Sequence, residues 1–311
     1  MIQIDSLNAI TSPFPNAVIT IGNFDGVHIG HQALFHQTVE KAQSINGTAI
    51  AMTFDPHPAR VLGNTDGPPL ITLHEQKMEL ISRTGLDVVI CVPFTVEFAS
   101  ISPEAFVEDL LIKKIGMKAM VVGEDYAYGS RRKGNLSTLR TAAERLGFEV
   151  ILVPGIQFPA PVSGRISSTR IRELVMDGNV TEAQKLLGRH YQVRGDVVPG
   201  RKRGGELVGF PTANLHLQDE LCPKMGVYAV TVECLGKRFK GVANIGFSPT
   251  FDDHLYTIEV HIIDFDGDLY GEKIRVNFIE RIRDEIKFSD SSQLSEQIKK
   301  DVQIARGLLS I

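Results

Sequence analysis

Residues 22–31 read Gly22-Asn23-Phe24-Asp25-Gly26-Val27-His28-Ile29-Gly30-His31. The apolar run before them, 17–21, is typical of a buried strand, and residues 32–40 after them have a helical pattern. A strand, a glycine-rich turn and a helix start together form an anion site, because backbone N–H groups and the helix dipole point at one spot. The two histidines are three residues apart, so they share one face of the first helical turn.

Three interpretations of this segment remain open. His28 and His31 could bind a metal, although no His-Glu-x-x-His pattern or cysteine cluster supplies further ligands. A turn with two solvated histidines would need no ligand at all. We prefer a nucleotide phosphate site, in which Gly26 and Gly30 let the ligand approach the backbone closely.

The composition indicates a soluble, globular, two-domain protein. The 311 residues are 43% hydrophobic and 23% charged, and they can build two ordinary domain cores. The net charge of −4 gives no broad attraction for nucleic acid, which is not an expected partner. Three widely spaced cysteines argue against a disulfide framework and a zinc site. Without a signal peptide or an apolar run of about 20 residues, a cytoplasmic location and no membrane contact are expected.

The first half predicts a doubly wound α/β fold. Helical patterns alternate with five short apolar runs, at 18–21, 49–54, 88–93, 119–122 and 150–153. Such alternation implies a parallel sheet with helices on both faces. Thr72 and Glu75 are spaced like a capping box for a helix that runs to Arg83, and Ser102-Pro103 predicts the start of another helix.

Polar segments follow three of the predicted strands, where ligands of such sheets bind. They are 22–31, then Asp55 and His57 after the second strand, then Asp125 after the fourth. Asp55 and His57 could instead brace a turn, since Asp-Pro is a turn former. Downstream, Ser168, Thr169 and Arg172 mark a second helix N-terminus, which could equally be a plain capped helix.

The second half predicts a small antiparallel β-barrel. From about Arg189 a period of two replaces helical spacing, and glycines punctuate short runs, so we expect domains at 1–188 and 189–311. After residue 289, apolar residues return to helical spacing and predict a helix that closes the barrel.

Three stretches of this half carry its chemistry: 209–215, 241–250 and 256–265. Thr212 and Asn214 offer neutral oxygen ligands of the kind magnesium accepts, or they form an Asx turn. Glu259 and His261 share one face of a predicted strand, where a glutamate is either a paired structural residue or a general base.

The segment at 22–31 resembles the signature of the nucleotidylyltransferase superfamily and, more narrowly, the FMN adenylyltransferase half of bacterial FAD synthetases. The Pro-Thr-Ala-Asn string at 211–214 resembles riboflavin kinases. The resemblance therefore implies the bacterial bifunctional riboflavin kinase/FMN adenylyltransferase family, with a Rossmann-like first domain. It implies a catalytic role for His28, His31, Arg172 and Glu259, and magnesium at Thr212 and Asn214. It implies ATP or flavin binding by Gly22, Asn23, Phe24, Asp25, Gly30, Asp55, His57, Asp125, Ser168, Thr169, Thr212 and Asn214.

The resemblance implies that ATP phosphorylates riboflavin to FMN in the second domain and adenylylates FMN to FAD in the first. The chain departs from the family at Ala127, where an arginine is usual, and in a loop, 203–208, that lacks the family's Gly-Arg pair. Two alternatives stay open. The altered loop motivates an FMN adenylyltransferase whose barrel only binds flavin, and the basic run Arg201-Lys202-Arg203 motivates a flavin-sensing regulator. We expect a monomer or a weak oligomer.

Overall fold

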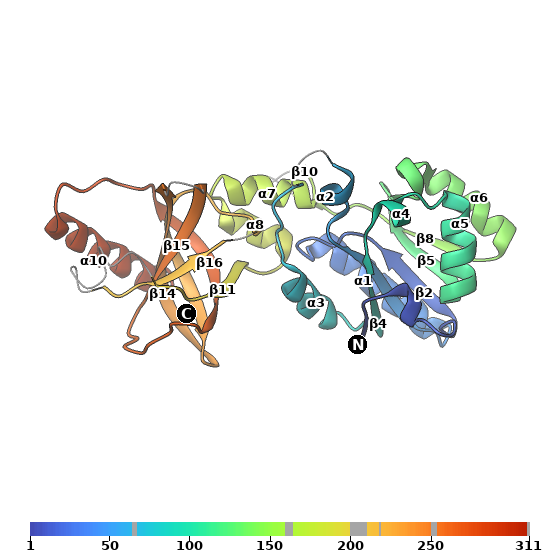
Figure 1. Ribbon diagram of the computed structural model, residues 1–311, viewed down its shortest axis with the longest axis horizontal. Coiled ribbons are helices and arrows are strands. Elements are labelled where there is room, and N and C mark those ends of the chain that lie inside the picture. The colour runs from blue at the N-terminus through green and yellow to red at the C-terminus, as the bar shows by residue number, and fades with distance from the viewer. Residues whose placement is uncertain (64–66, 159–163, 200–209, 218, 250–253, 310–311) are drawn as a thin grey trace. The chain divides into compact units, whose positions relative to one another are not determined.

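The five apolar runs of the first half form neighbouring parallel strands. The computed structural model in Figure 1 describes residues 1–63, 67–158, 164–199, 210–217, 219–249 and 254–309. The parallel sheet has the order β1-β4-β3-β2-β5-β8. Its strands are β1 (Ile2–Ile4), β2 (Ala17–Ile21), β3 (Ala49–Asp55), β4 (Val88–Pro93), β5 (Met117–Gly123) and β8 (Glu149–Val153). Only the edge strand β1 was not predicted, because three partly exposed residues carry no apolar run.

Alternation along the strands gives this sheet two buried faces. Val18 belongs to one core cluster, together with Phe35 of α1 (Ile29–Ser44) and Ile81 of α3 (His74–Ser82). Its neighbour Ile19 belongs to the other, with Leu111 of η2 (Phe106–Ile115). Successive side chains of a strand point to opposite faces, so helices must cover both sides. The prediction of a doubly wound sheet is confirmed.

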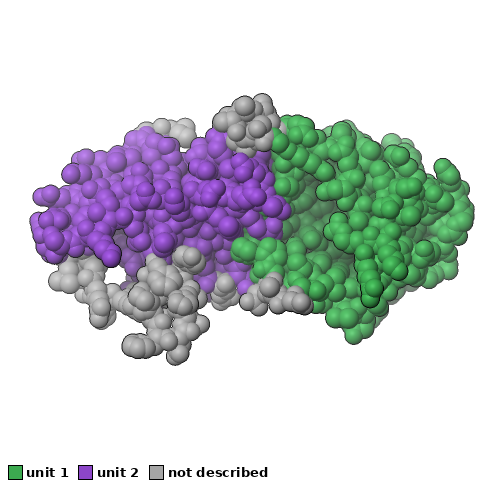
Figure 2. Space-filling view, turned by 90° about the horizontal axis from the view of Figure 1, so that it is seen from above, with its two compact units in different colours: residues 1–168 green, residues 169–311 purple. Residues whose placement is uncertain are grey.

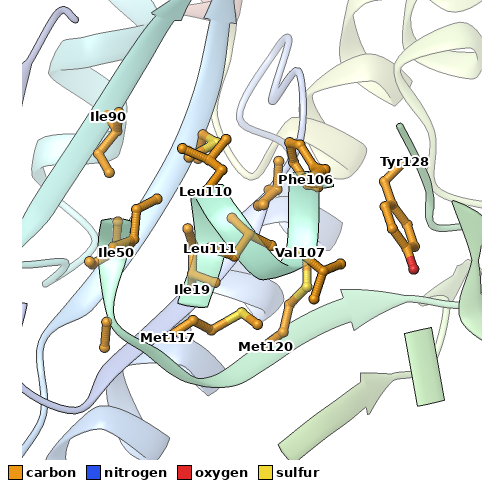
Figure 3. Close-up of a cluster of buried hydrophobic side chains, with 14 of the residues drawn as sticks. Ile19, Ile50, Ile90, Phe106, Val107, Leu110, Leu111, Met117, Met120 and Tyr128 are labelled. Carbon is orange, nitrogen blue, oxygen red and sulfur yellow. The ribbon is translucent and has the colours of Figure 1, made fainter. Parts of the chain in front are cut away.

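Figure 3 shows one of these cores. The helical segment η2 places Phe106, Leu110 and Leu111 against strand residues that include Ile50 and Ile90. Ser102 caps the short α5 (Pro103–Ala105) before it, as predicted. The remaining elements of this half are η1 (Leu7–Ala9), α2 (Pro58–Leu62), α4 (Val96–Ala99), β6 (Ala127–Tyr128), η3 (Ser130–Arg132), β7 (Gly134–Asn135), α6 (Leu136–Leu146), β9 (Gln157–Phe158) and β10 (Gly164–Arg165).

The start of α3 corrects one sequence prediction. The helix exists, but Leu73 is its N-cap residue and makes no side-chain capping bond, so the expected capping box is absent. The Thr72 hydroxyl donates instead to the carboxylate of Asp25 at 3.2 Å and accepts from Gly26 N at 3.0 Å. Thr72 therefore binds the buried carboxylate of Asp25 and does not cap the helix.

The chain forms two compact units, Met1–Ser168 and Thr169–Ile311, coloured separately in Figure 2. The second unit contains one antiparallel sheet of order β11-β16-β13-β14-β15-β12. Val198, two residues after the end of β11, forms a bridge with Asn214 of β12 at the other edge, so the sheet curls into a half-barrel, which confirms the predicted small barrel fold. The strands are β11 (Tyr191–Asp196), β12 (Ala213–His216), β13 (Gly226–Cys234), β14 (Lys237–Pro249), β15 (His254–Ile262) and β16 (Lys273–Arg283).

Among the described residues, three helices accompany the half-barrel. The chain enters through α7 (Ser168–Met176) and α8 (Val180–Leu187), and α8 contacts β11 and β16. The closing helix α10 (Ser291–Leu308), predicted from the sequence, contacts β13, β14 and β16. Arg283 of β16 binds α10 through Asp301: its Nη2 lies 2.7 Å and its Nε 3.0 Å from the two carboxylate oxygens.

Removing this buried carboxylate is expected to destabilise the second unit. Asp301 is 2% exposed, so Asp301→Ala leaves the Arg283 guanidinium without its anion and costs about 3–5 kcal/mol of unfolding free energy. Urea unfolding followed by circular dichroism measures the loss. The control is Asp264→Asn, which removes an exposed ion pair between Arg306 of α10 and the turn after β15, suits the positive φ of this position, and should shift the midpoint little. Equal shifts in the two variants would contradict the prediction.

Candidate active sites

A cavity of about 300 Å³ opens at the carboxyl ends of the parallel strands. Its lining comes from the segments after β2, β5 and β8, including Gly22, His28, His31 and Asp125. Chain order reverses at β2, since β3 lies on one side of it and β5 on the other. Such a switch point is where α/β sheets bind ligands. The convergence expected for the segments after the first and fourth predicted strands is therefore confirmed.

The two histidines lie together at the start of α1. His28 is the N-cap residue, and its Nδ1 accepts from the backbone N of His31 at 3.2 Å. The imidazole rings stack, with centroids 3.5 Å apart and planes 18° apart. Both rings line the cavity, where the positive end of a 16-residue helix favours an anion. No third His, Cys, Asp or Glu joins them in a metal-binding group within the described chain.

Asp25 and Phe24 support the loop from inside. The Asp25 carboxylate is 3% exposed and accepts from the backbone N of Ile71 at 3.1 Å and of Thr72 at 3.0 Å. Phe24 is 1% exposed, lines the cavity wall and packs edge-on against His31. In this structure Asp25 thus fixes the glycine-rich loop to the segment before α3, and its predicted contact with ATP or flavin stays a prediction.

The segment after β3 lies beside the same loop. The amide Nδ2 of Asn23 is 3.2 Å from Nε2 of His57, while Nδ1 of His57 accepts from Ala59 N and caps α2. Oδ2 of Asp55 lies 3.5 Å from Nδ1 of His74. Asn23, Asp55 and His57 are not among the residues that line the cavity, so their contact with ATP or flavin stays a prediction. The turn-bracing interpretation describes part of what Asp55 and His57 do, and His57 also contacts Asn23.

Asp125 and Ser168 complete the described part of the first site. Asp125 Oδ1 accepts from Nη2 of Arg165 at 2.8 Å, and both residues line the cavity. The Ser168 hydroxyl donates to the carbonyl of Asp25 at 2.9 Å, which fixes the start of α7 beside the glycine-rich loop. Thr169 and Arg172 belong to the second compact unit, and a site shared with His28 stays a prediction.

The second unit has its own cavity, of about 290 Å³. Glu259 of β15 lies directly opposite Asn214 of β12 and Asn244 of β14 in the strand register. Directly opposite residues share a face of a sheet, so a carboxylate lies between two amides. Glu259 and His261 both line the cavity, as expected for alternate residues on one face.

The environment of Glu259 favours proton acceptance. Although the residue is solvent-accessible, burial by surrounding protein atoms raises the pKa of its carboxyl, and the nearby carboxylate of Glu285 raises this pKa further. Glu285 lines the same cavity. A carboxylate with a raised pKa is a stronger base than an ordinary glutamate.

Thr212 lies where two cavities meet, because it lines both this one and a neighbouring space of about 120 Å³. The Asn214 amide donates to the Thr212 carbonyl at 3.4 Å, and Nδ1 of His261 lies 3.0 Å from the carbonyl of Pro211. These contacts fix the segment that carries the predicted magnesium ligands. Hydroxyl, amide and carboxylate oxygens suit magnesium held partly by substrate phosphates, so this donor set fits that ion.

Sequence reasoning missed several residues of both sites. Arg165, Asn244 and Glu285 line the cavities, yet the sequence gave none of them an individual role, although Asn244 lies in a stretch that was expected to carry chemistry. Asn244 needed the strand register that places it opposite Glu259, and this register has no local signal. Two further sequence features lie outside the described residues: the loop 203–208, which departs from the family pattern, and the basic run 201–203.

Comparison with known proteins gives both units a family. Residues 11–170 match the family model for FAD synthetase, and residues 187–309 match that for riboflavin kinase. The bifunctional riboflavin kinase/FMN adenylyltransferase of Listeria monocytogenes is 39% identical over 95% of this chain and 93% of its own length. The chain belongs to the bifunctional riboflavin kinase/FMN adenylyltransferase family.

Other members of this family agree with the assignment. The Escherichia coli K12 enzyme is 37% identical over 96% of this chain and 95% of its own. Among solved structures, one from Streptococcus pneumoniae described as a macrolide-efflux protein has 36% identity and a TM-score of 0.88, with 98% of each chain covered. As a family member the chain is an enzyme with a domain for each activity. In the described part of the chain, no helix combines the length and apolarity needed to cross a bilayer.

Proposed function

We propose that the chain makes FAD from riboflavin in two ATP-dependent steps, one in each half. The second unit phosphorylates riboflavin to FMN, and the first adenylylates FMN to FAD and releases pyrophosphate. The observation that carries the proposal is the presence of two chemically different sites. The first combines two stacked histidines with a helix N-terminus, and the second combines a carboxylate of raised pKa with oxygen donors.

The first site supplies charge stabilisation rather than a base. The phosphate of FMN is already an anion at neutral pH, so it can attack the α-phosphate of ATP without losing a proton. What the reaction needs is relief of negative charge at the α-phosphate and at departing pyrophosphate. We assign this to His28, His31 and Arg172, with backbone N–H groups of the glycine-rich loop and the start of α7.

The binding roles at this site are part of the proposal. Gly22, Asn23, Phe24, Asp25 and Gly30 shape the loop that would receive the nucleotide. The other proposed binding residues are Asp55, His57, Asp125, Ser168 and Thr169.

The second site supplies a base. The attacking group of riboflavin is a primary alcohol, which is a poor nucleophile while it holds its proton. Glu259 accepts that proton as the alcohol oxygen bonds to the terminal phosphorus of ATP and the bond to the β–γ bridging oxygen breaks, which releases ADP. Such a base contributes about 10²–10⁴-fold. Thr212 and Asn214 would hold magnesium, which would neutralise charge on the ATP phosphates.

The division of labour follows the predicted domains, 1–188 for adenylylation and 189–311 for phosphorylation. The proposal includes a cytoplasmic location, where ATP is available, and a monomer or weak oligomer that does not bind nucleic acid.

Intact protein supplied with riboflavin, ATP and magnesium is expected to form FMN first and then FAD. Chromatography of the flavins over time measures both products. Supplying FMN in place of riboflavin should give FAD directly, with one pyrophosphate per FAD. FAD formation from FMN without any FMN formation from riboflavin would instead indicate a barrel that only binds flavin. If the protein forms neither FMN nor FAD, the proposal is wrong.

A further inference from the structure

A buried lysine lies beneath the first site and joins two of its strands. Lys77 of α3 is 8% exposed. Its Nζ donates to the carbonyl of Phe54 at 3.1 Å, to the hydroxyl of Thr53 at 3.3 Å and to the carbonyl of Asn23 at 3.5 Å. An ammonium group has three N–H donors, and three acceptors surround this one.

The position of Lys77 is costly for a charged residue. Burial lowers the pKa of its ammonium, while Cys91, Asp55 and Asp25 act in the opposite direction. Lys77 lies four residues before the fully buried Ile81 on α3, so both side chains are on the same, inward face of the helix. An apolar side chain at position 77 would suit this face, and its burial would not require removing water from a charged group. Packing alone therefore does not account for a lysine here, whereas its hydrogen bonds do.

The acceptors identify what the lysine holds. Asn23 is the second residue of the glycine-rich loop after β2, and Thr53 and Phe54 are near the end of β3. The side chain of the same Asn23 and that of His57, two residues after the end of β3, approach each other, with Asn23 Nδ2 3.2 Å from His57 Nε2. Lys77 therefore ties together the two backbone segments that carry this pair, and it lies below the site without lining the cavity.

We propose that Lys77 is a positioning residue for FAD formation, which holds the ends of β2 and β3 so that Asn23 and His57 meet beside the glycine-rich loop, next to the residues that line the cavity. The inference rests on the proposed adenylyltransferase function. Without the ammonium group, the Phe54 carbonyl loses this donor, and the Asn23 carbonyl keeps only the weaker tie to β3 through the Thr53 hydroxyl, which donates to it at 3.1 Å. An unsatisfied polar group costs about 1–3 kcal/mol. The end of β3 then shifts toward water to hydrate the Phe54 carbonyl, which separates His57 from Asn23.

Lys77→Met removes the donors and keeps most of the side-chain volume. Because a displacement of about 1 Å can cost about 10²-fold in rate, we expect kcat/KM for FAD formation from FMN to fall about that much. Riboflavin phosphorylation by the same preparation should be unchanged, since its site lies in the other unit. Lys113→Met is the matched control, because that lysine of the same unit is exposed and pairs only with Asp109 on its own helix.

A double-mutant cycle separates positioning from general stability. If Lys77 acts through the Asn23–His57 pair, Lys77→Met in a His57→Ala background loses little beyond the larger single effect. Lys77→Gln, which retains two donors, should recover part of the lost activity, and it carries the test if the methionine variant does not fold.

Additive losses in the cycle would overturn the proposal, as would full activity of Lys77→Met or equal loss of both reactions. These results are distinct from failure of the proposed function, in which the unaltered protein forms no FAD from FMN.

Discussion

Replacing Glu259 by glutamine is expected to abolish FMN formation from riboflavin while FAD still forms from supplied FMN. Glutamine has nearly the shape of glutamate and keeps the place between Asn214 and Asn244, but it cannot accept the proton of the attacking alcohol. The expected loss in kcat is about 10²–10⁴-fold, the usual contribution of a positioned general base. The KM values for riboflavin and ATP should change much less, because the geometry of the cavity is kept.

Glu233→Gln is the matched control for this experiment. That glutamate belongs to the same sheet, in β13, and pairs with Arg238 away from the cavity. It should leave both reactions unchanged. If Glu259→Gln still forms FMN at the rate of the unaltered protein, Glu259 is a structural carboxylate and the base must be sought elsewhere. If the variant loses both reactions together, the assignment of one reaction to each unit fails.

Replacing His28 and His31 together by alanine is expected to have the opposite effect, loss of FAD formation with riboflavin phosphorylation retained. The two rings line the cavity at the positive end of α1, so their removal withdraws stabilisation from the phosphate charge of the transition state. A loss of about 10²–10³-fold in kcat is expected from the removal of such donors. Pyrophosphate release from ATP and FMN measures it.

A second variant keeps this test independent of folding. His28 also caps α1 by accepting from His31 N, and losing an N-cap costs about 1 kcal/mol of stability. His28→Asn retains an acceptor for the cap and removes the imidazole, so it should lose activity without loss of stability. His36→Ala, on an exposed face of the same helix, serves as the control. Normal FAD formation by His28→Asn and by the double alanine variant would contradict a catalytic role for the pair.

The features that could be predicted from the sequence are those with local signals. The strand β2, the glycine-rich loop and the start of α1 follow one another within residues 17–44, so periodicity and turn chemistry were sufficient. The same holds for Glu259 and His261, whose spacing places them on one face of a strand. The helical spacing after residue 289 likewise indicated α10.

The features that were missed depend on partners far apart in the chain. Thr72 was expected to cap α3, but its hydroxyl binds Asp25, which lies 47 residues earlier. Asn244 has a meaning only through the pairing of β14 with β15. Lys77 did leave a trace in the sequence, a lysine four residues before Ile81 on the inward face of a predicted helix. A lysine on an inward helix face indicates that hydrogen-bond acceptors surround it, but the sequence does not identify these acceptors.

The helix α8 has a practical consequence for any attempt to study the kinase half alone. Its residues Val180, Ala183, Leu186 and Leu187 are almost completely shielded, and the helix packs on β11 and β16 of the half-barrel. A polypeptide excised at residue 189 would leave that apolar surface bare to water, where it would promote aggregation. Inactivity of such a fragment would reflect its exposed apolar surface and would not show that the second unit lacks kinase activity. A fragment that begins before α7 would keep α8 packed on the half-barrel.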